Sequence, residues 1–233
     1  MRRRELILTA GALAAAPRLA IAATPPLVVL ELFTSQGCSS CPPADALLTE
    51  LARHPEIVAL TWHVDYWNNL SWRDPFARPE WTARQRRYAE ALRTDVYTPA
   101  LTVSGTQMLV GSNRSAVRAA ITAAPALPVP VSLQRSESGL TAQIGARPDA
   151  ASVTLVVYDP VHATSVGGGE NAGHILKESH IVRSATPVAA PAGPATLSLP
   201  PITADQGAVL LIQDRNLVVL GATQVRAAGE AVG

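Results

Sequence analysis

The chain has 233 residues, of which 48% are hydrophobic and 16% are charged, a composition typical of an ordinary globular protein. Its formal net charge of +1 excludes the basic surplus that marks nucleic-acid-binding proteins, so no nucleic-acid partner is expected. A length of this order suits one large domain or two small ones.

The first residues predict an export signal, which we place at residues 1–23. Arg2-Arg3-Arg4 form a charged start, Leu6–Ala16 is apolar but too short to span a bilayer, and Ala20-Ile21-Ala22-Ala23 offers small residues for cleavage near Ala22-Ala23. The weak apolar stretch and Arg18 favour the twin-arginine route over general secretion. A general secretory signal and an uncleaved anchor stay open as alternatives. We expect a periplasmic or secreted protein without a membrane span in its mature chain.

The residues that follow the signal alternate between strand and helix patterns. A continuous apolar run predicts a buried strand at 27–33, a small polar loop follows, and Pro42-Pro43 opens a helix over 44–53. Further strands are expected at 57–64, 100–103 and 107–110, and further helices at 80–93 and from Ser112 or Asn113 to about Ala123. This alternation predicts an α/β domain at residues 24–124.

The proline-rich segment Pro125–Pro130 is a stiff linker that marks a domain boundary. Beyond it, short strand candidates are separated by turn residues, and no helical periodicity is present. These candidates are Val131–Leu133, Leu140–Ile144, Val153–Tyr158, Ile175–Arg183, Ala195–Leu199, Ala208–Gln213 and Leu217–Gln224. We expect a small antiparallel β-sandwich-like domain at residues 129–228.

The two cysteines lie three positions apart in Cys38-Ser39-Ser40-Cys41, between a predicted strand and a predicted helix. The unpaired N–H groups and the dipole of a helix N-terminus stabilise a thiolate, so Cys38 is expected to be the more acidic and exposed thiol. A disulfide that closes so short a loop stabilises a fold by only about 2 kcal/mol. A redox-active dithiol is therefore favoured, while a static disulfide, a metal site and a chance pair of buried cysteines stay open.

Thr98-Pro99 comes directly before the strand at 100–103. In thioredoxin-like folds a cis-proline stands at this point and faces the two cysteines. We expect a cis bond here, with Pro99 presenting backbone edges to a substrate and Thr98 shaping the site. A generic trans proline is the alternative, since only about one X-Pro bond in twenty is cis.

An aromatic-rich stretch, Trp62-His63-Val64-Asp65-Tyr66-Trp67, follows the predicted strand at 57–64. Ligands of open α/β sheets bind at the C-terminal ends of strands, so this stretch and the cysteines are expected to share one face. His63 and Asp65 would project to the same side of an extended chain, and with Trp67 they are candidates to shape the site, tune the thiol pKa or relay protons. Aromatic packing beneath a long loop is the alternative.

Two weaker patterns lie in the second half. Gly167–Gly173 is a flexible loop that lacks the residues of a phosphate loop, and it is either a long hairpin connection or a loop that folds over the dithiol through Glu170 or Asn171. His162, His174 and His180 match no strong metal-binding template. No metal site and no cofactor are therefore predicted.

Several segments together resemble the exported domain-of-unknown-function 1223 family, over about residues 27–225. They are Glu31–Asp45, His63–Trp67, Val96–Pro99 and Gly169–Gly173. The resemblance implies a thioredoxin-like fold and export, and it brings no settled activity with it. One departure is Gly168, where the family pattern leads us to expect a basic residue.

These observations predict an α/β thioredoxin-like domain followed by a small all-β domain. The favoured activity is thiol–disulfide exchange with an exported protein or a small thiol or disulfide, in which Cys38 attacks and Cys41 resolves. Two other classes stay open. One is a non-catalytic binding module with a structural disulfide, and the other is metal handling, for example of copper, through Cys38, Cys41 and His63.

Overall fold

The computed structural model describes residues 27–68, 71–191 and 193–230, and the expected export signal lies outside these ranges. The elements of the first half are β1 (Val28–Thr34), α1 (Pro42–Leu51), β2 (Ile57–His63), α2 (Pro79–Leu92), β3 (Ala100–Val103), β4 (Gln107–Val110) and α3 (Arg114–Ala123). Those of the second half are β5 (Val131–Ser136), β6 (Gly139–Ile144), β7 (Ser152–Ser165), β8 (Ile175–Pro187), β9 (Ala195–Leu199), β10 (Gly207–Gln213) and β11 (Val219–Val225). None of the helices in these ranges is long and apolar enough to cross a membrane.

Local sequence explains where these elements begin. Every residue of β1 and β2 is buried, as a continuous apolar run predicts for strands covered on both faces. Helix α1 begins at Pro42-Pro43, and its buried leucines recur at helical spacing. Helix α3 begins after Asn113, whose side chain accepts a hydrogen bond from the backbone N–H of Ala116.

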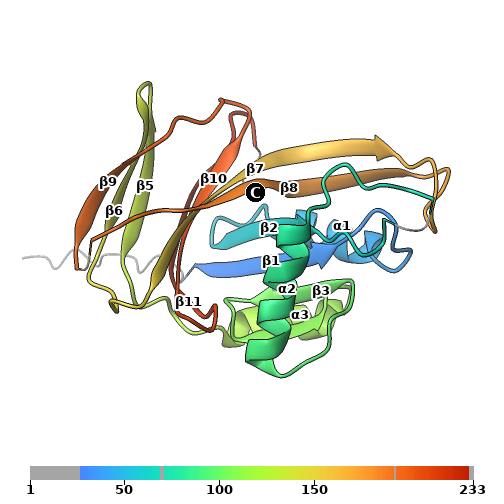
Figure 1. Cartoon of the computed structure of the whole chain (residues 1–233), viewed down its shortest axis with the longest axis horizontal. Helices are drawn as coiled ribbons and strands as arrows, with labels where there is room; N and C mark the ends of the chain where they lie inside the picture. Colours follow the sequence, from blue (N-terminus) through green and yellow to red (C-terminus); the bar gives the residue numbers. More distant parts are fainter. Residues whose placement is uncertain (1–26, 69–70, 192, 231–233) are drawn as a thin grey trace, which may run out of the picture.

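An eight-stranded mixed sheet runs through the molecule in the order β11-β10-β7-β8-β2-β1-β3-β4 (Figure 1). Strand β1 pairs with β2 in parallel, β2 pairs with β8 in parallel, and the other neighbours are antiparallel. A second sheet has the order β5-β6-β9. Figure 1 shows β7 and β8 as a long hairpin that begins near the small sheet and extends beside β2.

The predicted fold class is therefore wrong. The protein is mostly β, and strands from both halves of the chain share one sheet instead of forming an α/β thioredoxin-like domain followed by a separate all-β domain. The physical reason lies at the outer edge of β2, which would leave backbone N–H and C=O groups unpaired. Strand β8 covers that edge where Thr61 lies opposite Ile181.

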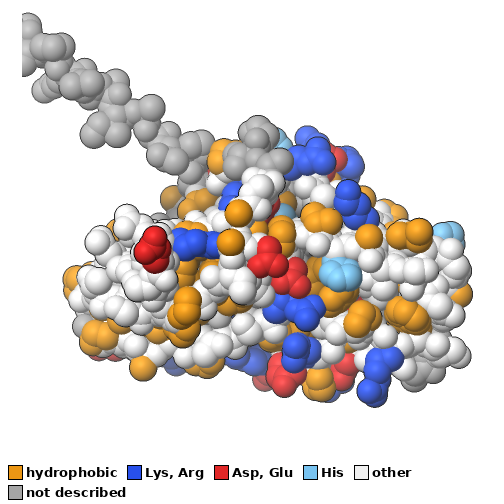
Figure 2. All heavy atoms as spheres, turned by 90° about the horizontal axis from the view of Figure 1, so that it is seen from above, with side chains coloured by type: hydrophobic (Ala, Val, Ile, Leu, Met, Phe, Trp, Pro, Cys, Tyr) orange, Lys and Arg blue, Asp and Glu red, His pale blue; other side chains and the backbone are white. Residues whose placement is uncertain are grey.

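The two faces of β1 pack against different layers of the core. Leu30 and Leu32 belong to the cluster that includes α1 and α3, while Val29 and Phe33 belong to the cluster that includes α2 and β10. A third cluster fills the space between the small sheet and the far part of the large one. On the face in Figure 2, acidic and basic side chains are interspersed with hydrophobic ones.

Candidate functional site

Cys38 and Cys41 form a disulfide at the start of α1, with their Cα atoms 5.5 Å apart. Cys41 is the residue that directly precedes the helix. Both cysteines are fully buried, whereas Ser39 and Ser40 between them are exposed. The expectation of a more exposed Cys38 does not hold in the disulfide form, because other segments lie over the loop.

The helix N-terminus offers this disulfide fewer donors than the sequence suggests. Pro42 and Pro43 fill the first two helical positions and have no N–H group, and the next N–H, that of Ala44, donates to the carbonyl of Cys41. The Ser40 hydroxyl lies 3.3 Å from Cys38 Sγ and is the donor, since a disulfide sulfur has no hydrogen. A Cys38 thiolate would thus be stabilised by the helix dipole and by Ser40.

A buried acid–base group lies beside the loop at the end of β2. His63 Nδ1 is 2.7 Å from Asp74 Oδ2, and His63 Nε2 is 3.8 Å from Glu178 Oε1. Burial lowers the pKa of His63, but the carboxylates of Asp74 and Glu178 outweigh this effect and raise that pKa to about 9. Glu178 comes from β8, so the group draws on both halves of the chain.

Gln36 connects this group to the cysteines. Its backbone N–H donates to Asp74 Oδ2 at 2.9 Å, and its side-chain amide donates to Glu178 Oε2 at 2.7 Å. Its side-chain oxygen accepts from the indole N–H of Trp72 at 3.1 Å. Gln36 is fully buried and lies two residues before Cys38, so the loop is anchored directly to the acid–base group.

Asp45 is the acid on α1 itself. Its backbone N–H donates to the carbonyl of Cys41, four residues earlier, which places the two side chains on one face of the helix. The residue is 5% exposed, and its Oδ1 atom has no hydrogen-bond partner. Burial and the nearby Glu178 raise the pKa of Asp45 to about 8, although His63 acts in the opposite direction. A neutral carboxyl group therefore stands close to Cys41 at neutral pH.

Trp67 joins the loop of the cysteines to the segment at Thr98-Pro99. Its indole N–H donates to Thr98 Oγ1 at 2.9 Å, and a Cβ atom on Gly37 would lie 3.1 Å from Trp67 Cβ. The Thr98–Pro99 bond is cis, which confirms the expectation for this position, and Pro99 is buried. The structure thus brings Trp67 and Thr98 to the neighbourhood of the cysteines.

Asp65 lies apart from this group. Strand β2 ends at His63, and the chain bends at Asp65, so the extended spacing that would align the two side chains does not persist. The Asp65 carboxylate accepts a hydrogen bond of 2.6 Å from the hydroxyl of Thr82 on α2. The acid that pairs with His63 is Asp74 instead.

The connection between β7 and β8, residues 166–174, lies over the cysteines, and we call it the cover loop. The side chain of Glu170 accepts from the backbone N–H and the hydroxyl of Ser39, and the side chain of Asn171 donates to the carbonyls of Gln36 and Cys38. Both interpretations of the glycine-rich loop hold: it is the long connection of the β7–β8 hairpin, and Glu170 and Asn171 contact the segment that carries the cysteines.

The residues that sequence reasoning missed are Gln36, Asp45, Asp74 and Glu178. Gln36 and Asp45 lie inside the segment that resembles the family, but no spacing rule singles them out. The three histidines of the second half do not converge: His162 packs on Phe76, and His180 pairs with Glu230 at 2.9 Å. Among the described residues, no group of three or more His, Cys, Asp or Glu side chains is arranged to hold a metal ion.

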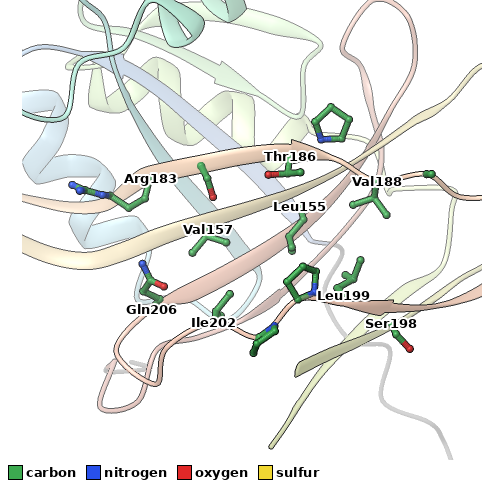
Figure 3. A pocket seen from close by; sticks show the side chains of 14 residues that line it. Leu155, Val157, Arg183, Thr186, Val188, Ser198, Leu199, Ile202 and Gln206 are labelled. Atoms are coloured by element: carbon green, nitrogen blue, oxygen red, sulfur yellow. The ribbon is translucent and has the colours of Figure 1, made fainter. Parts of the chain in front are cut away.

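A groove of about 560 Å³ lies elsewhere, between the β7–β8 hairpin and the segment that follows β9 (Figure 3). Apolar side chains dominate its wall, among them Leu155, Val157, Val188, Leu199 and Ile202. Neither cysteine nor any member of the acid–base group lines it. It is therefore a separate feature from the site around the disulfide.

Comparisons with known proteins give a family and a fold. A family model described as "Protein of unknown function (DUF1223)" matches residues 29–213. A protein of Agrobacterium tumefaciens with an X-ray crystal structure is 30% identical, with a TM-score of 0.78, over 91% of this chain and 99% of that one. HBP35 of Porphyromonas gingivalis shares the fold, with 15% identity and a TM-score of 0.57, over 88% of this chain and 76% of that one. No curated protein matches the chain.

Proposed function

This chain belongs to the DUF1223 family of proteins of unknown function, and we propose that it carries out thiol–disulfide exchange through Cys38 and Cys41. We place this activity in the periplasm or outside the cell, where disulfides persist, which the arginine-rich start of the chain supports. The partners would be exported proteins or small thiols and disulfides.

The proposal rests on the position of Asp45. Its buried carboxyl group lies one helical turn from Cys41, and one of its oxygens has no hydrogen-bond partner. A disulfide that only fastens a loop needs no such group, and burying a carboxyl oxygen without a hydrogen-bond partner costs stability. Buried groups with shifted pKa values occur often at functional sites. Asp45, on the same helix face as the Cys41 side chain, has the position of a proton acceptor.

The exchange would proceed in two balanced steps. The Cys38 thiolate attacks one sulfur of a substrate disulfide, forming a mixed disulfide and releasing one substrate sulfur as a thiolate, which takes a proton from water. Asp45 is ionised in a growing fraction of molecules as the pH approaches 8, and in that form it accepts the proton of Cys41, which then attacks Cys38 Sγ. That attack closes the Cys38–Cys41 disulfide and releases the second substrate sulfur. The same steps in reverse reduce the protein.

A second candidate is a structural disulfide, which the full burial of both cysteines favours. Its role would be to hold the loop in the shape that contacts the cover loop. In that case the pair would not exchange under the conditions that reduce a catalytic dithiol.

The test is to equilibrate the mature chain with glutathione buffers of graded ratio and to count free thiols by alkylation and mass spectrometry. We expect an equilibrium within the range of glutathione, and we expect Cys41→Ser to accumulate a mixed disulfide with glutathione. Cys38→Ser is the matched control and should accumulate little. A pair that stays oxidised at every ratio, with no adduct on Cys41→Ser, would establish the structural disulfide instead.

A further inference from the structure

The contacts of the cover loop are concentrated on the residues around Cys38. Glu170 Oε2 accepts from the backbone N–H of Ser39 at 2.9 Å and from its hydroxyl at 2.7 Å. Asn171 Nδ2 donates to the carbonyls of Gln36 and Cys38, both at 2.9 Å. Two donors and two acceptors beside the disulfide are thus occupied by one carboxylate and one amide.

These contacts differ in how firmly they are held. Asn171 is buried, whereas Glu170 and Ser39 are exposed. Hydrogen bonds from Ser39 lower the pKa of Glu170, so the carboxylate is ionised at neutral pH. An exposed charged contact contributes little net stability because water competes for both partners. The Glu170 contact is therefore one that another carboxylate can replace.

We propose that Glu170-Asn171 is an internal stand-in for the substrate, and that the substrate is a polypeptide with an acidic residue beside its reacting cysteine. The inference rests on the proposed function. The substrate carboxylate takes the N–H and hydroxyl of Ser39, and a substrate amide N–H takes the carbonyls of Gln36 and Cys38. This arrangement brings the substrate sulfur to Cys38.

The hydrogen-bond donors of Ser39, which Glu170 contacts, favour an acidic peptide over neutral and basic ones. When Glu170 leaves, the exposed N–H and hydroxyl of Ser39 are open to another acceptor, and a carboxylate makes stronger hydrogen bonds to them than a neutral group does. A glutamine at the same place in the peptide offers only a neutral oxygen. A lysine or arginine side chain offers no acceptor at all, so it leaves both Ser39 donors to water.

The experiment measures exchange between the reduced mature chain and two disulfide-linked peptides that differ only in Glu or Gln beside the cysteine. Glu170→Gln should accelerate exchange with both peptides and should prefer the Glu peptide by about fivefold or more. Ser39→Ala should lose at least half of that preference. Glu137→Gln, an exposed glutamate in the turn between β5 and β6, is the matched control and should behave as the parent.

A second measurement separates this inference from the proposed function. The same peptides with Ser in place of Cys are titrated against the oxidised Glu170→Gln chain, with tryptophan fluorescence as the readout. Tighter binding of the Glu peptide without any exchange would support acidic recognition and refute the redox function. Exchange at equal rates with both peptides, and equal binding, would overturn the stand-in and leave the redox function intact.

Discussion

The buried position of Asp45 is difficult to explain unless its carboxyl group takes part in the exchange. The residue shares a helix face with Cys41, and its neighbours are Glu178 and His63. We predict that Asp45→Asn slows the second step of exchange, the attack of Cys41 on a mixed disulfide, by roughly 100-fold, because the proton of Cys41 loses its acceptor. The first step, at Cys38, should be unchanged. Stopped-flow measurements with a chromogenic disulfide resolve the two steps.

The control for this variant is Glu50→Gln on the same helix. Glu50 pairs with Arg114 and Arg118 at the surface, so it tests a loss of helix charge without touching the site. The pH profile is the decisive readout: the second step of the parent should titrate with the carboxyl, and that titration should vanish in Asp45→Asn. Equal slowing of both steps, with the titration kept, would assign Asp45 a purely structural role.

The shifted pKa values also predict how stability depends on pH. The pKa of His63 rises from 6.5 to about 9 on folding, so its contribution is complete below pH 6.5 and is lost as the pH rises toward 9. The pKa of Asp45 rises from 3.8 to about 8, so the folded state also holds this proton more tightly, and stability again falls with rising pH. The Asp45 contribution is lost up to about pH 8 and that of His63 up to about pH 9, so we expect the free energy of unfolding to drop by about 3–5 kcal/mol between pH 6.5 and pH 9.

Urea unfolding at a series of pH values measures this dependence. His63→Asn should reduce the slope of the curve above pH 6.5, most clearly between pH 8 and pH 9, because one of the two groups that titrate there is gone. A free energy of unfolding that is constant or larger at pH 9 would contradict the charge state assigned to His63.

At the residue scale, the sequence predicts one of the three members of the acid–base group, His63. His63 is a candidate from the sequence because it ends a strand next to the predicted dithiol face. Spacing alone points to Asp65, two residues on, as its partner, and the structure has Asp74 and Glu178 instead. Glu178 lies more than a hundred residues away on β8. Its contact with His63 depends on the order of the strands in the sheet, which no local sequence pattern predicts.

At the scale of elements, the glycines of the cover loop let its backbone approach the segment at Ser71-Trp72. A Cβ atom on Gly168 would collide with the backbone oxygen of Ser71. We predict that Gly168→Ala lifts the cover loop and speeds reduction of the disulfide by dithiothreitol about fivefold, which corresponds to a loss of about 1 kcal/mol of contact. This clash also gives a reason for the glycine at a position where we expected a basic residue.

Gly173→Asn is the matched control within the same loop. Gly173 has a φ of +83°, and no atom lies within 4 Å of the place that a Cβ atom would occupy, so asparagine fits there. Its rate of reduction should equal that of the parent. Equal rates for all three chains would show that the cover loop does not limit access to the sulfurs.

The elements themselves are largely predictable from the sequence, and their assembly is not. The strands at 100–103, 107–110 and 195–199 have the predicted bounds, and Asn113 precedes α3 as one of the two expected caps. These features depend on local periodicity and capping. The pairing of β2 with β8 depends on one register contact between distant segments, Thr61 opposite Ile181, which periodicity does not encode.

At the scale of the whole molecule, a buried ion pair ties β1, α2 and β10 together. Arg84 Nε lies 2.7 Å from Glu31 Oε2, and Arg84 Nη2 donates to Gln213 Oε1 at 2.8 Å. The guanidinium stacks over the ring of Trp62, with 4.8 Å to the centroid. The helix predicted at 80–93 carries many charged residues, yet this arginine points inward, where it pairs with Glu31 and donates to Gln213.

We predict that Arg84→Ala lowers the free energy of unfolding by about 3–5 kcal/mol, because it leaves the fully buried Glu31 carboxylate without a counter-charge. Arg86→Ala, an exposed arginine on the same helix, is the control and should change stability by less than about 0.5 kcal/mol. Since Arg84 contacts both Glu31 on β1 and Gln213 on β10, fluorescence of the tryptophans near α2 and hydrogen exchange in β10 should report the same shift of the urea midpoint. A shift seen in the first half alone, with β10 unaffected, would show that the shared sheet does not unfold as one unit.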